Sequence, residues 1–446
     1  MNTRNRIWLA VGLCSLFANS HAWAQAKEQF IPLLVYRTGP YAPNGTPWAN
    51  GKQDYLKMVN ARDGGINGVK ITFEECETGY ATDRGVECYE RLKGKGPTGA
   101  TAFDPQSTGI TFALTDKAPG DKIPLITPGY GLSAAADGGV FKWNFPILDT
   151  YWTAADILIQ HIGKKEGGLE KLKGKKIALV YHDSPYGKEP IPLLQERARM
   201  HGFELQLLPV TAPGVEQKST WLQVRQARPD YVLLWGWGVM NSTALKEAQA
   251  SGYPREKMFG VYWSGTEPDV KDVGTAANGY SALNMQNELG TTKAAQDILK
   301  YVHAKGEGSG PKDEVGSILY NNGMIISMLT VEAVRRAQER FGPGKPMTGE
   351  QVRWAFENLA LDQKKLDSLG FGKLVRPIST SCVDHMGVPT ARVQTWDGAK
   401  WNFVSPPIEA DLSLLKPMVK VAADKYAAEK KLTRRTPADC QSDAMK

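Results

Sequence analysis

The sequence of 446 residues contains few cysteines, few histidines and only a small excess of basic residues. Its five cysteines are too sparse for a small disulfide-stapled scaffold, and no two of its six histidines lie four residues apart, as helical zinc ligands do. The net charge of +7 comes from 54 basic and 47 acidic residues that are interspersed along the chain. We therefore expect no metal site and no nucleic-acid partner.

Motifs for catalysis and for nucleotide binding are also scarce. The letters of a catalytic triad occur as His182-Asp183-Ser184, but three consecutive residues at a strand end cannot form a hydrogen-bonded relay. No phosphate-binding loop occurs, and Gly236-Trp237-Gly238 lacks the third glycine of a dinucleotide fingerprint. We expect neither an enzyme nor a cofactor.

One long apolar run occurs, at the start of the chain. Arg4 and Arg6 precede the apolar residues 7–17, and Ala22-Trp23-Ala24 follows them. This order predicts a secretory signal peptide that is cleaved after Ala24. The run is about half of the ~20 residues that cross a bilayer, so a retained anchor is the weaker interpretation. We expect an exported protein that is not embedded in the membrane.

Cleavage would leave four cysteines, in an oxidising compartment where disulfides form. Four cysteines allow three pairings, and two disulfides are expected. The cost of loop closure favours Cys76 with Cys88, which would leave Cys382 with Cys440 to hold the C-terminal tail.

Short β-rich runs alternate with amphipathic stretches from residue 30 onward, which is typical of an α/β fold with mostly parallel sheets. Two such series, joined near residues 146–152, predict two lobes. Strands are expected within residues 30–36, 69–73, 123–127, 177–183, 203–210, 230–238 and 258–265, and a hairpin at 392–404. Helices are expected at 46–61, 188–201, 216–227, 241–252, 291–305, 315–340 and 348–360.

Aromatic residues collect where predicted strands end. The set comprises Trp235, Trp237, Tyr262 and Trp263 at two consecutive strand ends, with Tyr41, Tyr130 and Tyr186 just after three others. Ligands of open parallel sheets bind outside the carboxyl ends of the strands, so a pocket is expected here. Strand alternation would place Trp235 and Trp237 on one side, with Gly236 and Gly238 leaving the backbone accessible. The alternative is that these rings are ordinary core.

Residues 38–73, TGPYAPNGTPWANGKQDYLKMVNARDGGINGVKITF, resemble the first βαβ unit of the periplasmic branched-chain amino-acid-binding protein family, the type I solute-binding proteins of ABC importers. PLITPG (124–129), YHDSPYGKE (181–189) and DYVLLWGWG (230–238) match in the same order. The resemblance implies two Rossmann-like lobes joined by a three-stranded hinge and closing on a small solute. It also implies the Cys76–Cys88 pairing.

The resemblance suggests a division of the chain and a set of partners. After the signal peptide at 1–24, lobe I would comprise 25–148 and 281–361, lobe II 149–280 and 385–411, and a disulfide-tied tail 412–446. The protein would be a periplasmic monomer that binds a small-molecule solute and meets an ABC importer permease in the membrane. A sensory receptor of the same fold and an exported enzyme are the alternatives.

The family resemblance also suggests ligand-binding positions. Tyr41 would wall the cleft, Gln106 and Ser107 would offer donors, and Tyr130 with the backbone of its neighbours would meet a polar head. The full set is Tyr41, Gln106, Ser107, Gly129, Tyr130, Tyr186, Trp235, Trp237, Tyr262 and Trp263.

Two departures from the family pattern bear on the ligand. Family members that hold α-amino acids pair the ammonium with an acidic residue where this sequence has Tyr262 or Trp263, and Gly131 replaces a hydroxyl. A buried ammonium without a partner costs several kcal/mol, so an aromatic or other carboxylate-type solute is favoured over an aliphatic amino acid. The alternative is that Glu267 or Asp104 reaches the ligand and restores amino-acid binding.

Overall fold

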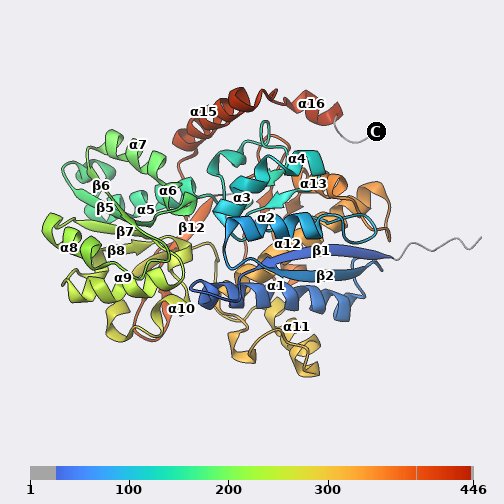
Figure 1. The fold of residues 1–446 in the computed structure, drawn as a ribbon, viewed down its shortest axis with the longest axis horizontal. Coiled ribbons are helices and arrows are strands. Elements are labelled where there is room, and N and C mark those ends of the chain that lie inside the picture. The colour runs from blue at the N-terminus through green and yellow to red at the C-terminus, as the bar shows by residue number, and fades with distance from the viewer. Residues whose placement is uncertain (1–26, 388, 443–446) are drawn as a thin grey trace, which may run out of the picture.

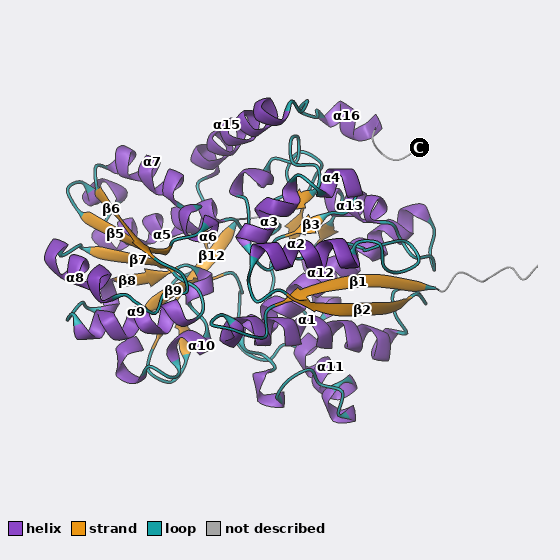
Figure 2. Ribbon diagram, viewed as in Figure 1, coloured by secondary structure: helices purple, strands orange, loops and turns teal. Residues whose placement is uncertain are grey.

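The computed structural model of the protein describes residues 27–387 and 389–442. The predicted signal peptide lies outside these residues. Two lobes lie side by side, and helices cover the strands of both (Figures 1 and 2). The α/β fold with two lobes that the sequence predicts is therefore confirmed.

In lobe I, β1 (Glu28–Val35) pairs in parallel with β2 (Lys70–Glu77), and β3 (Leu125–Ile126) with β4 (Asn144–Phe145). The Thr101 amide donates to the Phe30 carbonyl, and Phe103 forms a parallel bridge to Leu125, so the segment 101–103 links the two pairs. The remaining elements of the lobe are α2 (Thr82–Leu92), α3 (Thr108–Thr115), α4 (Ala118–Asp121), α11 (Lys293–Tyr301), α13 (Gly349–Glu357), β10 (Ala360–Leu361), α14 (Gln363–Leu369) and β11 (Ile378–Ser379).

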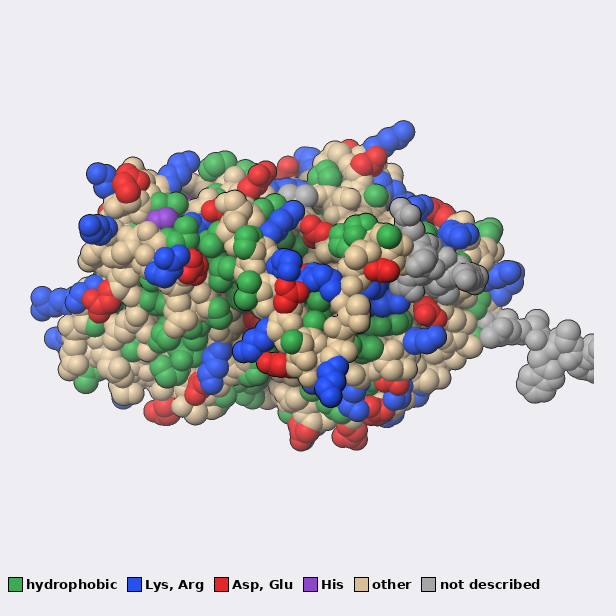
Figure 3. Space-filling model, turned by 90° about the horizontal axis from the view of Figure 1, so that it is seen from above, with side chains coloured by type: hydrophobic (Ala, Val, Ile, Leu, Met, Phe, Trp, Pro, Cys, Tyr) green, Lys and Arg blue, Asp and Glu red, His purple; other side chains and the backbone are tan. Residues whose placement is uncertain are grey.

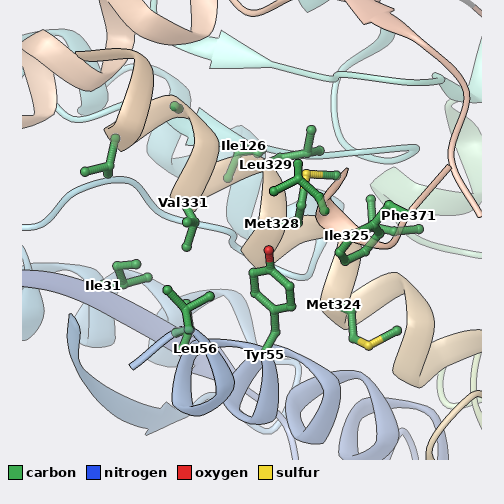
Figure 4. Packing of buried hydrophobic residues seen from close by; sticks show 14 of the residues in the cluster. Ile31, Tyr55, Leu56, Ile126, Met324, Ile325, Met328, Leu329, Val331 and Phe371 are labelled. Carbon is green, nitrogen blue, oxygen red and sulfur yellow. The ribbon is translucent and has the colours of Figure 1, made fainter. Parts of the chain in front are cut away.

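Two long helices, α1 (Ala42–Asp63) and α12 (Ile318–Phe341), pack closely against each other in lobe I. A Cβ on Gly51 would lie 2.0 Å from the Tyr320 carbonyl oxygen, and one on Gly323 would lie 2.2 Å from that of Trp48. Glycine at both positions is therefore what lets the two backbones meet. Figure 4 shows Tyr55 and Leu56 of α1 facing Met328 and Leu329 of α12 across the core.

Lobe II is built on one sheet with the strand order β13-β12-β9-β8-β7-β5-β6. Adjacent strands from β6 to β9 are parallel, and β12 is antiparallel to β9. The strands are β5 (Lys176–His182), β6 (Glu204–Val210), β7 (Tyr231–Trp235), β8 (Met258–Gly260), β9 (Ser281–Asn284), β12 (Thr390–Trp396), β13 (Trp401–Phe403) and β14 (Ile408–Glu409). The hairpin expected at 392–404 is present as β12 and β13.

Alternate residues of a strand serve opposite faces of this sheet. Ile177 and Leu179 join the core under α5 (Tyr151–Glu166) and α7 (Ile191–His201), whereas Ala178 and Val180 join the core under α8 (Lys218–Ala227) and α9 (Val239–Ala250). Both faces are buried, as parallel sheets require. Short helices α6 (Pro185–Lys188) and α10 (Glu267–Val270) follow two of the strands.

The chain crosses between the lobes near Leu148, near Met285 and between Ser379 and Thr390. The predicted start of the second lobe I segment at residue 281 is wrong, because β9 pairs with β8 and β12 inside the lobe II sheet. Lobe I resumes only after this strand.

A C-terminal helix, α15 (Leu412–Lys430), runs along the outside of the molecule from lobe II to lobe I (Figure 1). At its start, Asp411 contacts Arg197 of lobe II at 3.3 Å, and at its end Lys430 contacts Asp116 of lobe I at 2.5 Å. The segment ends in α16 (Pro437–Ser442), where Cys440 is bonded to Cys382. The second disulfide, Cys76–Cys88, joins β2 to α2.

The surface seen in Figure 3 carries acidic and basic side chains close together across both lobes, in keeping with the small net charge. Among the residues described, no helix has the length and apolarity needed to cross a membrane.

Candidate ligand-binding site

A small cavity lies between the lobes and is walled almost entirely by aromatic rings. It holds about 240 Å³ of space that no atom fills, part of which is open to solvent. Typical ligand pockets enclose ~300–1,000 Å³, so the cavity suits a small solute and has to widen to admit one. Its lining residues are Tyr36, Trp48, Tyr80, Gln106, Ser107, Thr108, Tyr130, Tyr151, Tyr186, Trp237 and Trp263.

Most of the ring pairs meet edge to face, but Tyr151 and Tyr186 are tilted by 57° and one other pair is stacked. Trp48 of lobe I stacks on Trp263 of lobe II with centroids 4.8 Å apart and planes 15° apart. Trp237 meets Trp263 edge to face at 5.8 Å, and Tyr130 meets Trp48 in the same way at 5.8 Å. Both lobes therefore supply rings to one aromatic box.

Several polar groups of this box are buried without a hydrogen bond within the described part of the chain. They are the Tyr36 hydroxyl, the indole N–H groups of Trp48 and Trp237, and both ends of the Gln106 amide. Burial raises the pKa of the Tyr36 hydroxyl well above its ordinary value. The Trp237 indole lies nearby and acts to lower this pKa, but the two groups do not have the geometry of a hydrogen bond. Unsatisfied buried donors of this kind are costly, so their presence together points to a ligand that accepts hydrogen bonds.

Gln106 has a φ of 54°, in the left-handed region that a non-glycine residue rarely adopts. Ser107 next to it caps α3, with its hydroxyl accepting from the Ile110 amide at 3.4 Å. The backbone N–H of Gln106 donates to the Tyr130 hydroxyl at 2.9 Å. Backbone strain that is fixed by its surroundings is common at binding sites, and here it directs the Gln106 side chain to the cavity.

A buried ion pair supports this wall from behind. Lys52 Nζ lies 2.7 Å from Asp104 Oδ2, and their side chains are only 2% and 4% exposed. The other Asp104 oxygen accepts from the Tyr130 hydroxyl. Asp104 is thus fully engaged behind Tyr130, and the alternative that it serves the ligand directly has no support in this arrangement.

Of the ten predicted ligand-binding residues, the structure brings six to the cavity wall: Gln106, Ser107, Tyr130, Tyr186, Trp237 and Trp263. Three others lie at the contact between the lobes. The Tyr41 hydroxyl bonds His182 Nε2 at 2.8 Å, and the Gly129 carbonyl accepts from the Tyr262 hydroxyl at 2.6 Å. Trp263 Nε1 also donates to that carbonyl, at 2.9 Å. These bonds join the lobes in a closed arrangement.

Trp235 is buried inside lobe II and does not line the cavity. The expected alternation of Trp235 with Trp237 fails because β7 ends at Trp235, before Trp237 is reached. Gly238 also has a different role from the one predicted. A Cβ on Gly238 would lie 2.8 Å from the Pro40 carbonyl oxygen, so this glycine allows the first loop of lobe I to approach.

Glu267, the other carboxylate considered for an ammonium, faces lobe I and not the cavity. Its two oxygens lie 3.1 and 3.2 Å from the Ile318 amide at the start of α12. A carboxylate here satisfies an otherwise unpaired N–H group of the helix and favours its dipole. Burial raises the pKa of this carboxyl to about 7.

Five lining residues were not predicted as ligand-binding: Tyr36, Trp48, Tyr80, Thr108 and Tyr151. Tyr36 directly follows β1 and Tyr80 lies shortly after β2, so the strand-end signal that selected the other aromatics was available for both. Trp48 lies within the helix expected at 46–61, as Tyr55 does, and the structure places the two residues in different clusters.

A second carboxyl between the lobes, Glu189, gives a testable pH dependence. Its Oε2 accepts from the Ser133 hydroxyl at 2.5 Å, and burial raises its pKa to about 8. A raised pKa means that the folded protein binds more protons than the unfolded chain between pH ~4.5 and 8, so this group lowers stability as the pH rises through that window.

Glu189→Gln is therefore expected to gain ~3 kcal/mol of unfolding free energy relative to the unmodified protein between pH 5 and pH 8. Urea denaturation at both pH values measures the difference. Glu204→Gln, at an exposed position on β6, is the control and should leave the pH profile unchanged. A Glu189→Gln difference that is the same at both pH values would contradict the assignment.

Comparison with known proteins identifies the family. Residues 28–400 match the family model described as periplasmic binding protein. The chain belongs to the periplasmic binding protein family. It is a solute-binding protein of the ABC-transporter type. Among curated proteins no sequence match is found.

Solved structures of similar fold support this membership of the periplasmic binding protein family. A protein described as an ABC transporter permease from the Pseudomonas fluorescens group is 40% identical, with a TM-score of 0.84, over 92% of this chain and 100% of its own. A Thermus thermophilus branched-chain amino acid ABC transporter protein with bound valine is 22% identical (TM-score 0.72; 88% and 99% covered). A Rhodopseudomonas palustris solute-binding protein in complex with benzoate is 17% identical (TM-score 0.65; 86% and 98% covered).

Proposed function

We propose that this periplasmic binding protein captures a small aromatic or other carboxylate-type solute and delivers it to the membrane permease of an ABC importer. The observation that carries the proposal is the chemistry of the cavity wall. Every side chain that lines it is an aromatic ring, a hydroxyl or an amide, and the buried groups left unpaired there are mostly donors.

Such a wall suits both parts of an aromatic acid, its apolar ring and its carboxylate. The rings of Trp48, Trp237 and Tyr130 offer faces and edges to an apolar body. The hydroxyl of Tyr36, which stays protonated, and the indole and amide N–H groups can donate to carboxylate oxygens. An α-amino acid would leave its ammonium without a carboxylate, since Asp104 and Glu267 are engaged elsewhere. Benzoate in the R. palustris protein of the same fold is consistent with this choice.

Closure follows from the division of the wall between the lobes. Tyr36, Trp48 and Gln106 come from lobe I, and Trp237 and Trp263 come from lobe II, so a solute contacts the whole set only when the lobes meet. Binding then shifts the population toward the closed form. We propose that the permease recognises this form, that the protein acts as a monomer, and that it releases the solute chemically unchanged.

A thermal-shift screen of the protein without residues 1–24 tests the ligand class. Benzoate and its 4-hydroxy and 3,4-dihydroxy derivatives are compared with leucine, isoleucine and valine. A ligand at 100 times its dissociation constant adds ~2.7 kcal/mol to the free energy of unfolding, which is a clear shift. We expect an aromatic acid to give the largest shift. If leucine, isoleucine or valine stabilises the protein more than every aromatic acid, the proposed ligand class is wrong.

A further inference from the structure

Trp263 lines two separate spaces. One is the aromatic cavity, and the other is a slot at the hinge with about 520 Å³ of space that no atom fills, part of it open to solvent. Trp263 is the one residue that appears in the wall of both, within the part of the chain that the structure describes. The slot lies beside the crossings between the lobes, and its wall includes Leu148, Met285, residues 375–377 and Thr390.

The chemistry of the slot differs from that of the cavity. Its wall is mainly aliphatic, with Pro128, Met285, Ile325 and Ile326 beside one cation, Arg376. The guanidinium Nε of Arg376 bonds the Asn287 side chain at 2.6 Å, and burial lowers the pKa of the group. An aliphatic slot with a guanidinium in its wall suits an apolar chain or ring that carries an anionic group.

The position of the Trp263 indole is fixed from two sides. Its Nε1 donates to the Gly129 carbonyl at 2.9 Å, and one face stacks on Trp48. Trp48 belongs to the cavity wall and not to the slot wall. The ring therefore stands between the two spaces, and its side chain is only 3% exposed.

We propose that Trp263 is a specificity-determining residue that limits the length of the solute. With the indole in place, a ligand is confined to the cavity and only a single-ring compound fits. Without it, the cavity and the slot form one elongated space that ends near Arg376 and accepts two-ring or alkyl-extended carboxylates. This inference rests on the proposed function for the identity of the cavity as the ligand site.

The test compares Trp263→Ala with the unmodified protein, using benzoate and biphenyl-4-carboxylate as probes in calorimetric titrations. We expect biphenyl-4-carboxylate to bind at least 10-fold more tightly to the variant than to the unmodified protein. Tyr262→Phe is the matched control, because it also removes a hydrogen bond to Gly129 but opens no space. It should gain no affinity for the longer probe. Trp263→Leu is the second variant if Trp263→Ala does not melt cooperatively.

Arg376→Gln in the Trp263→Ala background checks the far end of the joined space. It should raise the dissociation constant of biphenyl-4,4′-dicarboxylate at least 5-fold and change that of biphenyl-4-carboxylate less than 2-fold. The inference is overturned if the longer probe binds the unmodified protein as tightly as the variant, or if the variant gains nothing. A variant that gains the longer probe while the unmodified protein binds no single-ring acid would support the partition and contradict the proposed function instead.

Discussion

Trp237→Ala is expected to raise the dissociation constant of the solute ~100-fold while the protein still folds and is exported. The Trp237 ring supplies a wall of the cavity, and its unpaired N–H is one of the donors available to the ligand. Truncation of a central aromatic contact typically costs 2 kcal/mol or more of binding free energy, and ~2.7 kcal/mol corresponds to a factor of 100. Calorimetric titration with the best aromatic acid of the screen measures the change.

Trp354→Ala is the matched control for this substitution. Trp354 lies on α13 in lobe I, where its ring meets Phe341 edge to face at 5.2 Å, away from the cavity. Its removal should lower the melting temperature and leave the dissociation constant within twofold. Equal losses of affinity in the two variants would show that the solute does not bind in this cavity.

The second large effect is expected at the buried ion pair behind the cavity. Asp104→Ala would leave the ammonium of Lys52 buried without a charge partner and remove the acceptor of the Tyr130 hydroxyl. Breaking a buried pair in this way costs ~3–5 kcal/mol, so urea denaturation should show a loss of that size. Solute affinity should also fall, because Tyr130 loses the contact that orients it.

A double variant separates the charge effect from packing. Lys52→Met combined with Asp104→Leu leaves no uncompensated charge, and it should recover most of the stability that Asp104→Ala loses. Asp116→Ala, which breaks an exposed pair with Lys430, should cost less than ~1 kcal/mol. If Asp104→Ala costs no more than Asp116→Ala, the pair does not have the supporting role assigned to it.

The sequence contained enough information for the fold because its hydrophobic periodicity agrees with its turn residues. The helix expected at 46–61 is α1 (Ala42–Asp63), and it ends at Gly64, whose φ of 70° is typical of a glycine that terminates a helix. The strand at 281–284 was missed because it is only four residues long, and its place in lobe II depends on pairing with β12, more than a hundred residues later.

The site was only partly predictable, because strand ends locate a pocket but do not show which side chains face it. Trp48 and Tyr55 lie on one helix face, two turns or ~10.5 Å apart along the axis. Over that distance, Tyr55 packs in the core of lobe I while Trp48 reaches the cavity between the lobes. Trp235 was wrongly predicted to line the cavity beside Trp237, because strand alternation was assumed to continue past the end of β7 at Trp235.

We propose the aromatic cavity between the lobes as the site that binds an aromatic carboxylate-type solute and closes on it. A calorimetric competition between 4-hydroxybenzoate and leucine, on the unmodified protein and on Trp237→Ala, tests this most directly. The account predicts one site per chain, at least 10-fold tighter binding of the aromatic acid than of leucine, and loss of that binding in the variant. Tighter binding of leucine, or binding of the aromatic acid that Trp237→Ala leaves intact, would contradict it.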